Sequence, residues 1–168
     1  EPAPIPTGKL KSEDCGPDII GTELLKDTTA IVLGELHGLA SAPAFTADLA
    51  CRVAFSHPDK TVTLALEIPD SEQARVDAFL ASEGRGPDRK AMTDGPFWST
   101  AMRDGRSSVA RVDMLERIRV MKRQGALIRV VLIDGADPRD ETMAKRVVAA
   151  IQDKRGPVIA LVGNLHAR

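Results

Sequence analysis

The chain has 168 residues, of which 43% are hydrophobic and 28% are charged, as in ordinary globular domains. A formal net charge of −1 gives no electrostatic reason to expect nucleic acid or an anionic membrane surface as a partner. Aromatic residues make up only 3%, which argues against base stacking, and no apolar stretch approaches the roughly 20 residues that span a bilayer. We therefore expect one folded domain with no transmembrane segment and no nucleic-acid partner.

The first 28 residues are predicted to be an extended lead-in to a single domain at residues 29–168, because they begin with a Pro-rich run and show no core pattern. Such a beginning suits an exported protein whose signal peptide has been removed, and a trimmed sequence would look the same. Cys15 and Cys51 are the only cysteines. A disulfide between them and two separate thiols are equally compatible with the spacing.

Apolar segments of strand length alternate with helical patterns along the rest of the chain. Four near-continuous apolar segments predict strands buried on both faces of a parallel sheet, at residues 30–33, 62–66, 127–133 and 158–162. Helices are predicted at residues 41–57, 71–80, 107–124 and 139–154. The Gly- and Pro-containing stretch 81–100 is predicted to be a long loop with room for a short helical piece. This order predicts a layered α/β fold with a central, mostly parallel β-sheet flanked by helices.

The sequence ends shortly after the last predicted strand. The few residues after this strand are too short a segment to cover it or to continue the sheet. We therefore expect that the chain is an incomplete fragment of a longer polypeptide, or that a partner such as a second copy in a homodimer covers the last strand.

A four-residue pattern occurs twice, each time at the end of a predicted strand. Gly34-Glu35-Leu36-His37 follows the first strand, and Gly163-Asn164-Leu165-His166 follows the last. We expect each Gly to let the chain turn sharply as it leaves the sheet, because Gly tolerates positive φ. A single Gly-x-x-His is common by chance. Two of the three histidines of the chain lie in these patterns, so the repetition suggests a site.

Polar residues end all four predicted strands. The carboxyl ends of parallel strands share one edge of a sheet, where open α/β folds bind their ligands. The residues predicted to converge there are Glu35, His37, Glu67, Asp134, Asn164 and His166. Imidazole and carboxylate groups suit a divalent transition metal, and they also suit general base and acid catalysis. The simpler alternatives are an ion pair for Glu67, a turn role for Asp134 and a solvated His166.

Neither Ser nor Cys occupies a nucleophile context, so water is the expected nucleophile, activated by His, Glu or a metal. Arg106 precedes a predicted helix start and, with Ser107 and Ser108, could bind a carboxylate or stabilise an oxyanion. The alternative is a helix N-cap beside a solvated Arg. Phe97 and Trp98 either form an apolar wall for a ligand or pack in the core.

Four short motifs together resemble the Tiki, erythromycin-esterase and ChaN-like superfamily, with its ChaN-like branch closest. They are Gly34-Glu35-Leu36-His37-Gly38, Leu66-Glu67, the segment 104–108 and Gly163-Asn164-Leu165-His166-Ala167. The resemblance spans about residues 30–167. It implies an α/β fold whose pocket is lined by the two Gly-x-x-His motifs and the Glu. It also implies a bacterial protein that is periplasmic or membrane-associated.

The resemblance implies two alternative functions. The first is a hydrolase for an ester or amide bond of a small molecule or peptide, with Glu35, His37, Glu67 and His166 as catalytic residues and, optionally, as ligands of a divalent metal. Arg106, Asn164 and Asp134 would then contact the substrate. The second is a haem- or iron-binding uptake protein without catalysis. Because the chain has no Tyr, its haem ligand would be His37, His166 or a Met such as Met102.

Overall fold

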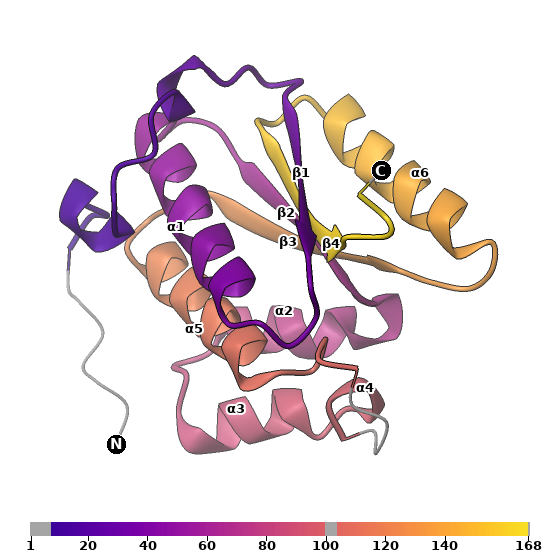
Figure 1. Cartoon of the computed structure of the whole chain (residues 1–168). Helices are drawn as coiled ribbons and strands as arrows, with labels where there is room; N and C mark the ends of the chain where they lie inside the picture. The colour runs from indigo at the N-terminus through magenta and orange to yellow at the C-terminus, as the bar shows by residue number, and fades with distance from the viewer. Residues whose placement is uncertain (1–7, 100–103, 168) are drawn as a thin grey trace.

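The computed structural model describes residues 8–99 and 104–167, which form one β-sheet with helices on both faces (Figure 1). The four strands are β1 (Ala30–Glu35), β2 (Val62–Pro69), β3 (Ile128–Asp134) and β4 (Val158–Gly163). Their order in the sheet is β1-β4-β2-β3, and every neighbouring pair is parallel. The predicted layered α/β fold is confirmed.

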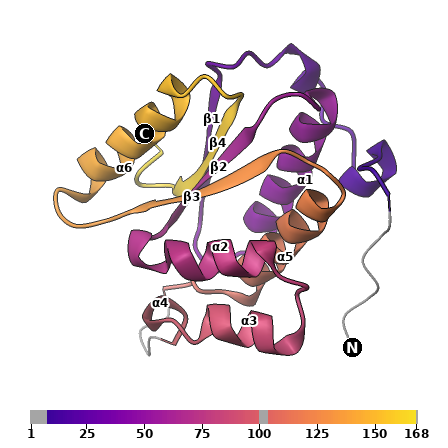
Figure 2. The ribbon, with the colours of Figure 1, turned by 180° about the vertical axis from the view of Figure 1, so that it is seen from behind.

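The helices are divided unequally between the two faces of the sheet. α1 (Ser41–Ser56), α2 (Gln73–Ala81) and α5 (Val109–Arg123) cover one face, and α6 (Arg139–Gln152) lies on the other (Figures 1 and 2). These four helices correspond to the four predicted ones. Figure 2 shows α3 (Gly86–Thr93) against the outer side of α2, away from the sheet.

The stretch 81–100 is mostly helical where the structure describes it, so the prediction of a long loop is wrong there. It contains α3 and the short α4 (Pro96–Ser99). The Asp88 carboxylate accepts a hydrogen bond of 2.9 Å from the backbone N–H of Arg85, and Pro87 lies in the first turn of α3. The Gly and Pro residues therefore mark helix starts rather than continuous loop.

The last strand is not at an edge of the sheet. β4 lies between β1 and β2, and all six of its residues are buried. The expectation that nothing in the chain covers the last strand is therefore wrong, because the chain returns to the middle of the sheet after α6. Within the described residues, β1 and β3 are the edge strands.

The two sheet faces differ in how well they are covered. On the side of α1, α2 and α5, strand residues such as Leu64 and Leu161 belong to a large buried cluster. On the side of α6, Ala65, Ala160 and Val162 belong to a smaller one. Burial alternates along β1, and Val32 remains 51% exposed. The single helix α6 thus leaves part of its face uncovered.

The described part of the segment before β1 packs against α1 through two 3₁₀ turns rather than remaining extended. It contains the 3₁₀ turns η1 (Ser12–Cys15) and η2 (Thr22–Leu24), and a disulfide joins the buried Cys15 and Cys51. The buried Arg52 donates a hydrogen bond of 2.7 Å to Ser12 Oγ and one of 3.1 Å to the carbonyl of Pro17. No helix in the described part of the chain is both long and apolar enough to cross a membrane.

Candidate active site

The predicted convergence at the carboxyl edge of the sheet is confirmed for five side chains. Glu35 ends β1, Glu67 lies near the end of β2, and Asp134 ends β3; all three are buried. His37 and His166 follow β1 and β4, with side chains 24% and 22% exposed. The buried carboxylates thus form the floor of the site, and the two imidazoles reach its surface.

Only one of the two ring nitrogens of His37 has a hydrogen-bond partner among the described residues. Its Nδ1 lies 3.0 Å from Glu35 Oε1, and its Nε2 lies 3.8 Å from Glu67 Oε1, beyond hydrogen-bond distance. Arg111 of α5 is also buried and donates a hydrogen bond to Glu35. Burial lowers the pKa of Arg111, and the charge of Glu35 opposes that shift. Arg111 therefore holds Glu35, which in turn orients His37.

Glu67 binds two arginine side chains and one backbone N–H at the site. Its Oε2 accepts a hydrogen bond of 2.6 Å from the backbone N–H of Gly163. Its Oε1 accepts one from Arg139 and lies 3.4 Å from Nη1 of Arg106. With both oxygens engaged, Glu67 is placed to position the two guanidinium groups rather than to accept a proton.

Asp134 joins the same two arginines from β3. It accepts hydrogen bonds of 2.6 Å from Arg106 Nη1 and 2.6 Å from Arg139 Nε. Burial alone would raise the pKa of Asp134, but the hydrogen bond and charge of Arg139, with those of Arg106, outweigh it and hold the pKa below its usual range. The hydrogen bond to Asp134 correspondingly raises the pKa of Arg139.

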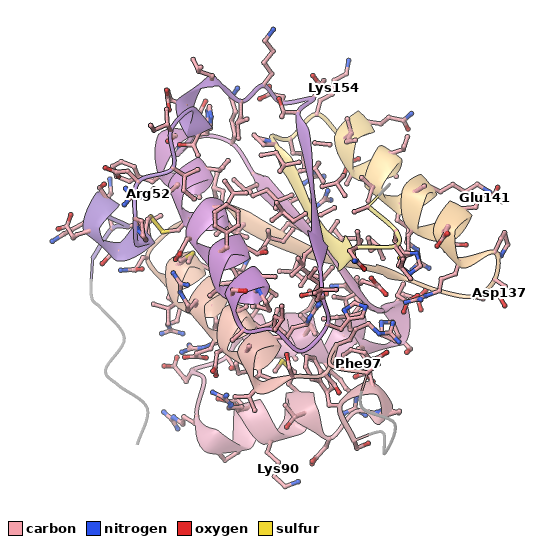
Figure 3. All side chains as sticks on the ribbon, viewed as in Figure 1. Arg52, Lys90, Phe97, Asp137, Glu141 and Lys154 are labelled. Carbon is pink, nitrogen blue, oxygen red and sulfur yellow. A yellow bond between two sulfur atoms is a disulfide. The ribbon has the colours of Figure 1, made fainter. Side chains whose placement is uncertain are left out.

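Arg106 is drawn into the site rather than solvated. Its Nε lies 2.7 Å from Asp104 Oδ2, and its guanidinium carbon lies 5.9 Å from the ring centre of Phe97. Figure 3 shows Phe97 close to the side chains that gather at this end of the sheet. Within the described residues, Nη2 of Arg106 makes no hydrogen bond. Ser108 is the N-cap of α5, and Trp98 packs in the core.

The side chain of His166 contacts two residues of α6. Its Nδ1 lies 2.7 Å from Asp140 Oδ1, at ion-pair distance but without the angle of a hydrogen bond. Its Nε2 lies 3.4 Å from Arg139 Nη1 and 3.9 Å from Glu67 Oε1. Both imidazoles therefore lie within 4 Å of the same oxygen of Glu67, and His166 is not an idle, solvated residue.

Asn164 does not join the other predicted residues. It is exposed, and its side-chain amide has no hydrogen-bond partner within the part of the chain that the structure describes. Only its backbone contributes, through a hydrogen bond of 2.9 Å from its N–H to the carbonyl of Glu35. Its side chain therefore makes no hydrogen bond to the other residues predicted at this edge of the sheet.

The glycines of the two motifs provide space rather than a turn. Neither Gly34 nor Gly163 has a positive φ, so the expectation of a sharp turn at these residues is wrong; the left-handed residue is Gly38, with φ +90°. A Cβ on Gly163 would lie 2.8 Å from His37 Nε2 and 3.4 Å from Glu67 Oε2. The missing side chain of Gly163 therefore allows His37 and Glu67 to lie close to each other.

A divalent metal does not fit this arrangement. Among the described residues, no group of three or more His, Cys, Asp or Glu side chains is placed to hold a metal ion. Glu35, Glu67 and Asp134 are already bound by guanidinium groups, whose positive charge opposes a nearby cation. The charge of each buried carboxylate is thus balanced by arginine.

Haem gains no support from the two histidines. His37 Nε2 lies 3.8 Å from Glu67 Oε1, and His166 Nε2 lies 3.4 Å from Arg139 Nη1, so a charged group lies close to each of the two nitrogens. Met102, the other candidate ligand, lies outside the described residues. The haem alternative rests on the resemblance alone.

Two important residues were not identified from the sequence. Arg111 lies on the same helical face as Leu115 and Ile118, and a charge among core positions is a signal of a buried ion pair. Arg139 begins α6, where a positive charge is unfavourable unless it is paired, because the helix N-terminus is itself positive.

Comparison of the chain with models of protein families, with curated proteins and with solved structures finds no match in any of the three.

Proposed function

We propose that the chain is a hydrolase that cleaves an ester or amide bond, with water as the nucleophile and His37 as the general base. The observation that carries this proposal is the environment of the His37 ring. Nδ1 is held at 3.0 Å by the buried Glu35, whereas Nε2 has no hydrogen-bond partner in the described residues and belongs to a side chain that is 24% exposed. The resemblance to the superfamily that includes erythromycin esterases supports the same function.

The proposed reaction begins with a water molecule beside His37 Nε2. The imidazole takes a proton from this water as its oxygen attacks the carbonyl carbon, and Glu35 stabilises the imidazolium through Nδ1–H. Collapse of the tetrahedral intermediate breaks the bond to the leaving group, which receives a proton. The products are a carboxylic acid and an alcohol or amine.

The other residues have separate roles in this mechanism. Nη2 of Arg106 has no hydrogen-bond acceptor among the described residues, so it can donate a hydrogen bond to the oxyanion of the intermediate. His166 is close enough to the same centre to donate the proton that the leaving group receives. Glu67 and Asp134 position Arg106 and Arg139, because they bind both guanidinium groups. No step requires a metal.

Turnover of p-nitrophenyl acetate by the purified chain, with and without EDTA, tests this proposal. We expect hydrolysis that the chelator does not change. His37→Gln should reduce kcat about 10²–10⁴-fold, the usual contribution of a general base. His57→Gln is the matched control, since His57 lies away from the site and contacts the carbonyl of Thr22 at 2.9 Å; it should keep the wild-type rate.

Two results would contradict the mechanism. One is full activity of folded His37→Gln, as judged by circular dichroism. The other is loss of activity on chelation that zinc or manganese restores, which would make a metal part of the mechanism. Absence of any turnover over a panel of p-nitrophenyl esters and p-nitroanilides would reject the hydrolase itself.

A further inference from the structure

An apolar groove lies on the α6 face of the sheet, directly beside the candidate site. Its volume is about 230 Å³. Apolar side chains of β1, β4 and α6 form its walls, among them Val32, Val162, Met143 and Val147. Figure 1 shows α6 alone on this face, with β1 at the edge of the sheet. The groove exists because one helix is too narrow to cover four strands.

One end of the groove is polar and belongs to the candidate site. His166 and Asp140 line this end. His166 Nε2 lies 3.9 Å from Glu67 Oε1, and His37 Nε2 lies 3.8 Å from the same oxygen. A molecule whose reacting carbonyl lies beside His37 and His166 can therefore extend its apolar part into the groove.

We infer that the groove binds the apolar acyl part of the substrate, so that the preferred substrates are esters or amides of short-chain or single-ring carboxylic acids. This inference rests on the proposed function. A groove with apolar walls and one polar end matches an amphiphilic molecule, because the acyl chain leaves water while its carbonyl stays among charged groups.

The size of the groove favours a small group over a protein partner. Its volume is below the range of about 300–1,000 Å³ that is typical for drug-sized ligands. A stable protein interface needs about 800 Å² per partner, far more surface than such a groove offers. Val32 at its rim is half-exposed, and an acyl chain would remove this side chain from water.

A series of p-nitrophenyl esters tests the inference. From acetate through butyrate to hexanoate, kcat/KM should rise roughly two- to fourfold per added methylene, as expected for partial to complete burial, and should then level off as the groove fills. Ala144→Leu places a larger side chain into the groove from the exposed side of α6, and it should lower the ratio of hexanoate to acetate kcat/KM at least fivefold. Ala149→Leu, at an exposed position of α6 outside the groove, should keep that ratio.

Binding of hexanoate, measured by NMR without any turnover, separates this inference from the hydrolase proposal. We expect methyl shifts at Val32, Val147 and Val162 in the wild type that are lost in Ala144→Leu. Such shifts in a protein that hydrolyses no ester would support acyl binding in the groove and contradict the proposed hydrolase function. Acetate turnover with a flat ester series and no methyl shifts would reject the groove and keep the hydrolase. Self-association that Ala144→Leu abolishes would make a second copy the occupant and overturn the inference.

Discussion

The two Gly-x-x-His motifs have the same spacing but occupy different positions in the sheet. β1 includes Glu35, the second residue of its motif, whereas β4 ends at Gly163, the first residue of its motif. In the parallel pairing, Glu35 is aligned with Gly163 and Gly34 with Val162. The motifs are therefore offset by one residue, and an offset of one residue reverses the side of a strand to which a side chain points.

This offset explains why the second residue of each motif has a different environment. Glu35 is buried beneath His37 and bound to Arg111, whereas Asn164 is exposed beyond the end of its strand. His37 is consequently held by its own motif, and His166 is held by Asp140 and Arg139 of α6. A local motif thus does not determine the role of its residues unless its register in the sheet is also known.

Placing at the second position of each motif the residue of the other motif should give the largest difference in stability between two variants. In Glu35→Asn, Arg111 keeps a buried charge without a partner, so we expect the free energy of unfolding to fall by about 3–5 kcal/mol and hydrolysis to be lost. Asn164→Glu changes an exposed side chain and should stay within about 0.5 kcal/mol of the wild type. Urea unfolding followed by circular dichroism measures both, and equal losses would reject the asymmetry between the motifs.

The glycines of the two motifs should also respond differently to a methyl group. In Gly163→Ala the new Cβ would lie 2.8 Å from His37 Nε2, so the imidazole must move. A displacement of about 1 Å at a reacting group can cost roughly 10²-fold in rate, and a side chain can shift at little cost in stability. In Gly34→Ala the new Cβ would instead lie 3.1 Å from Ala167 Cβ and 3.2 Å from Asn164 Cα, away from His37.

Steady-state turnover and melting temperature, measured on both glycine variants, check this prediction. We expect Gly163→Ala to lose far more activity than stability, and Gly34→Ala to retain most of its activity. The same activity in both variants would show that crowding at His37 Nε2 does not limit the reaction.

The two histidines should be separable by the leaving group. p-Nitrophenolate departs readily without a proton, so His166→Ala should hydrolyse p-nitrophenyl acetate at close to the wild-type rate. With the ethyl ester of the same acid, whose leaving group needs a proton, the variant should be slower by about 10²-fold. His37→Gln should be impaired with both esters. A His166→Ala defect of the same size on both esters would assign His166 to binding rather than to proton donation.

The smallest expected effect is on the pH dependence of stability, and it concerns Asp134, which holds Arg139 near His166. Its pKa is lower in the folded protein than the value of about 3.9 expected for an unfolded chain. The ionised carboxylate therefore stabilises the fold above about pH 4, and this stabilisation is lost as the pH falls through the lower, folded-state pKa. Asp134→Asn lacks the ionised group at every pH.

We therefore expect the free energy of unfolding of the wild type to fall more steeply than that of Asp134→Asn as the pH is lowered below about 4. Urea titrations at several pH values across this window measure the difference. Parallel curves for the two proteins would contradict the assignment of this carboxylate.

The features that the sequence determined are local or follow from the direction of the strands. Apolar runs predicted the four strands, periodic patterns predicted α1, α2, α5 and α6, and the shared carboxyl edge predicted that Glu35, His37, Glu67, Asp134 and His166 would meet. A side chain at the end of a buried parallel strand has few alternatives, since its backbone position is set by the sheet. This part of the site could be predicted without coordinates.

Only the tertiary structure decided the remaining features, because they depend on pairings between distant segments. The sequence does not specify that β4 lies between β1 and β2, which disulfide state is present, or which helix supplies Arg111 and Arg139 to the carboxylates. The role of each glycine was likewise decided by which residue approaches it from another strand. Strand order and register bring these groups together, and neither is encoded in the spacing of residues along the chain.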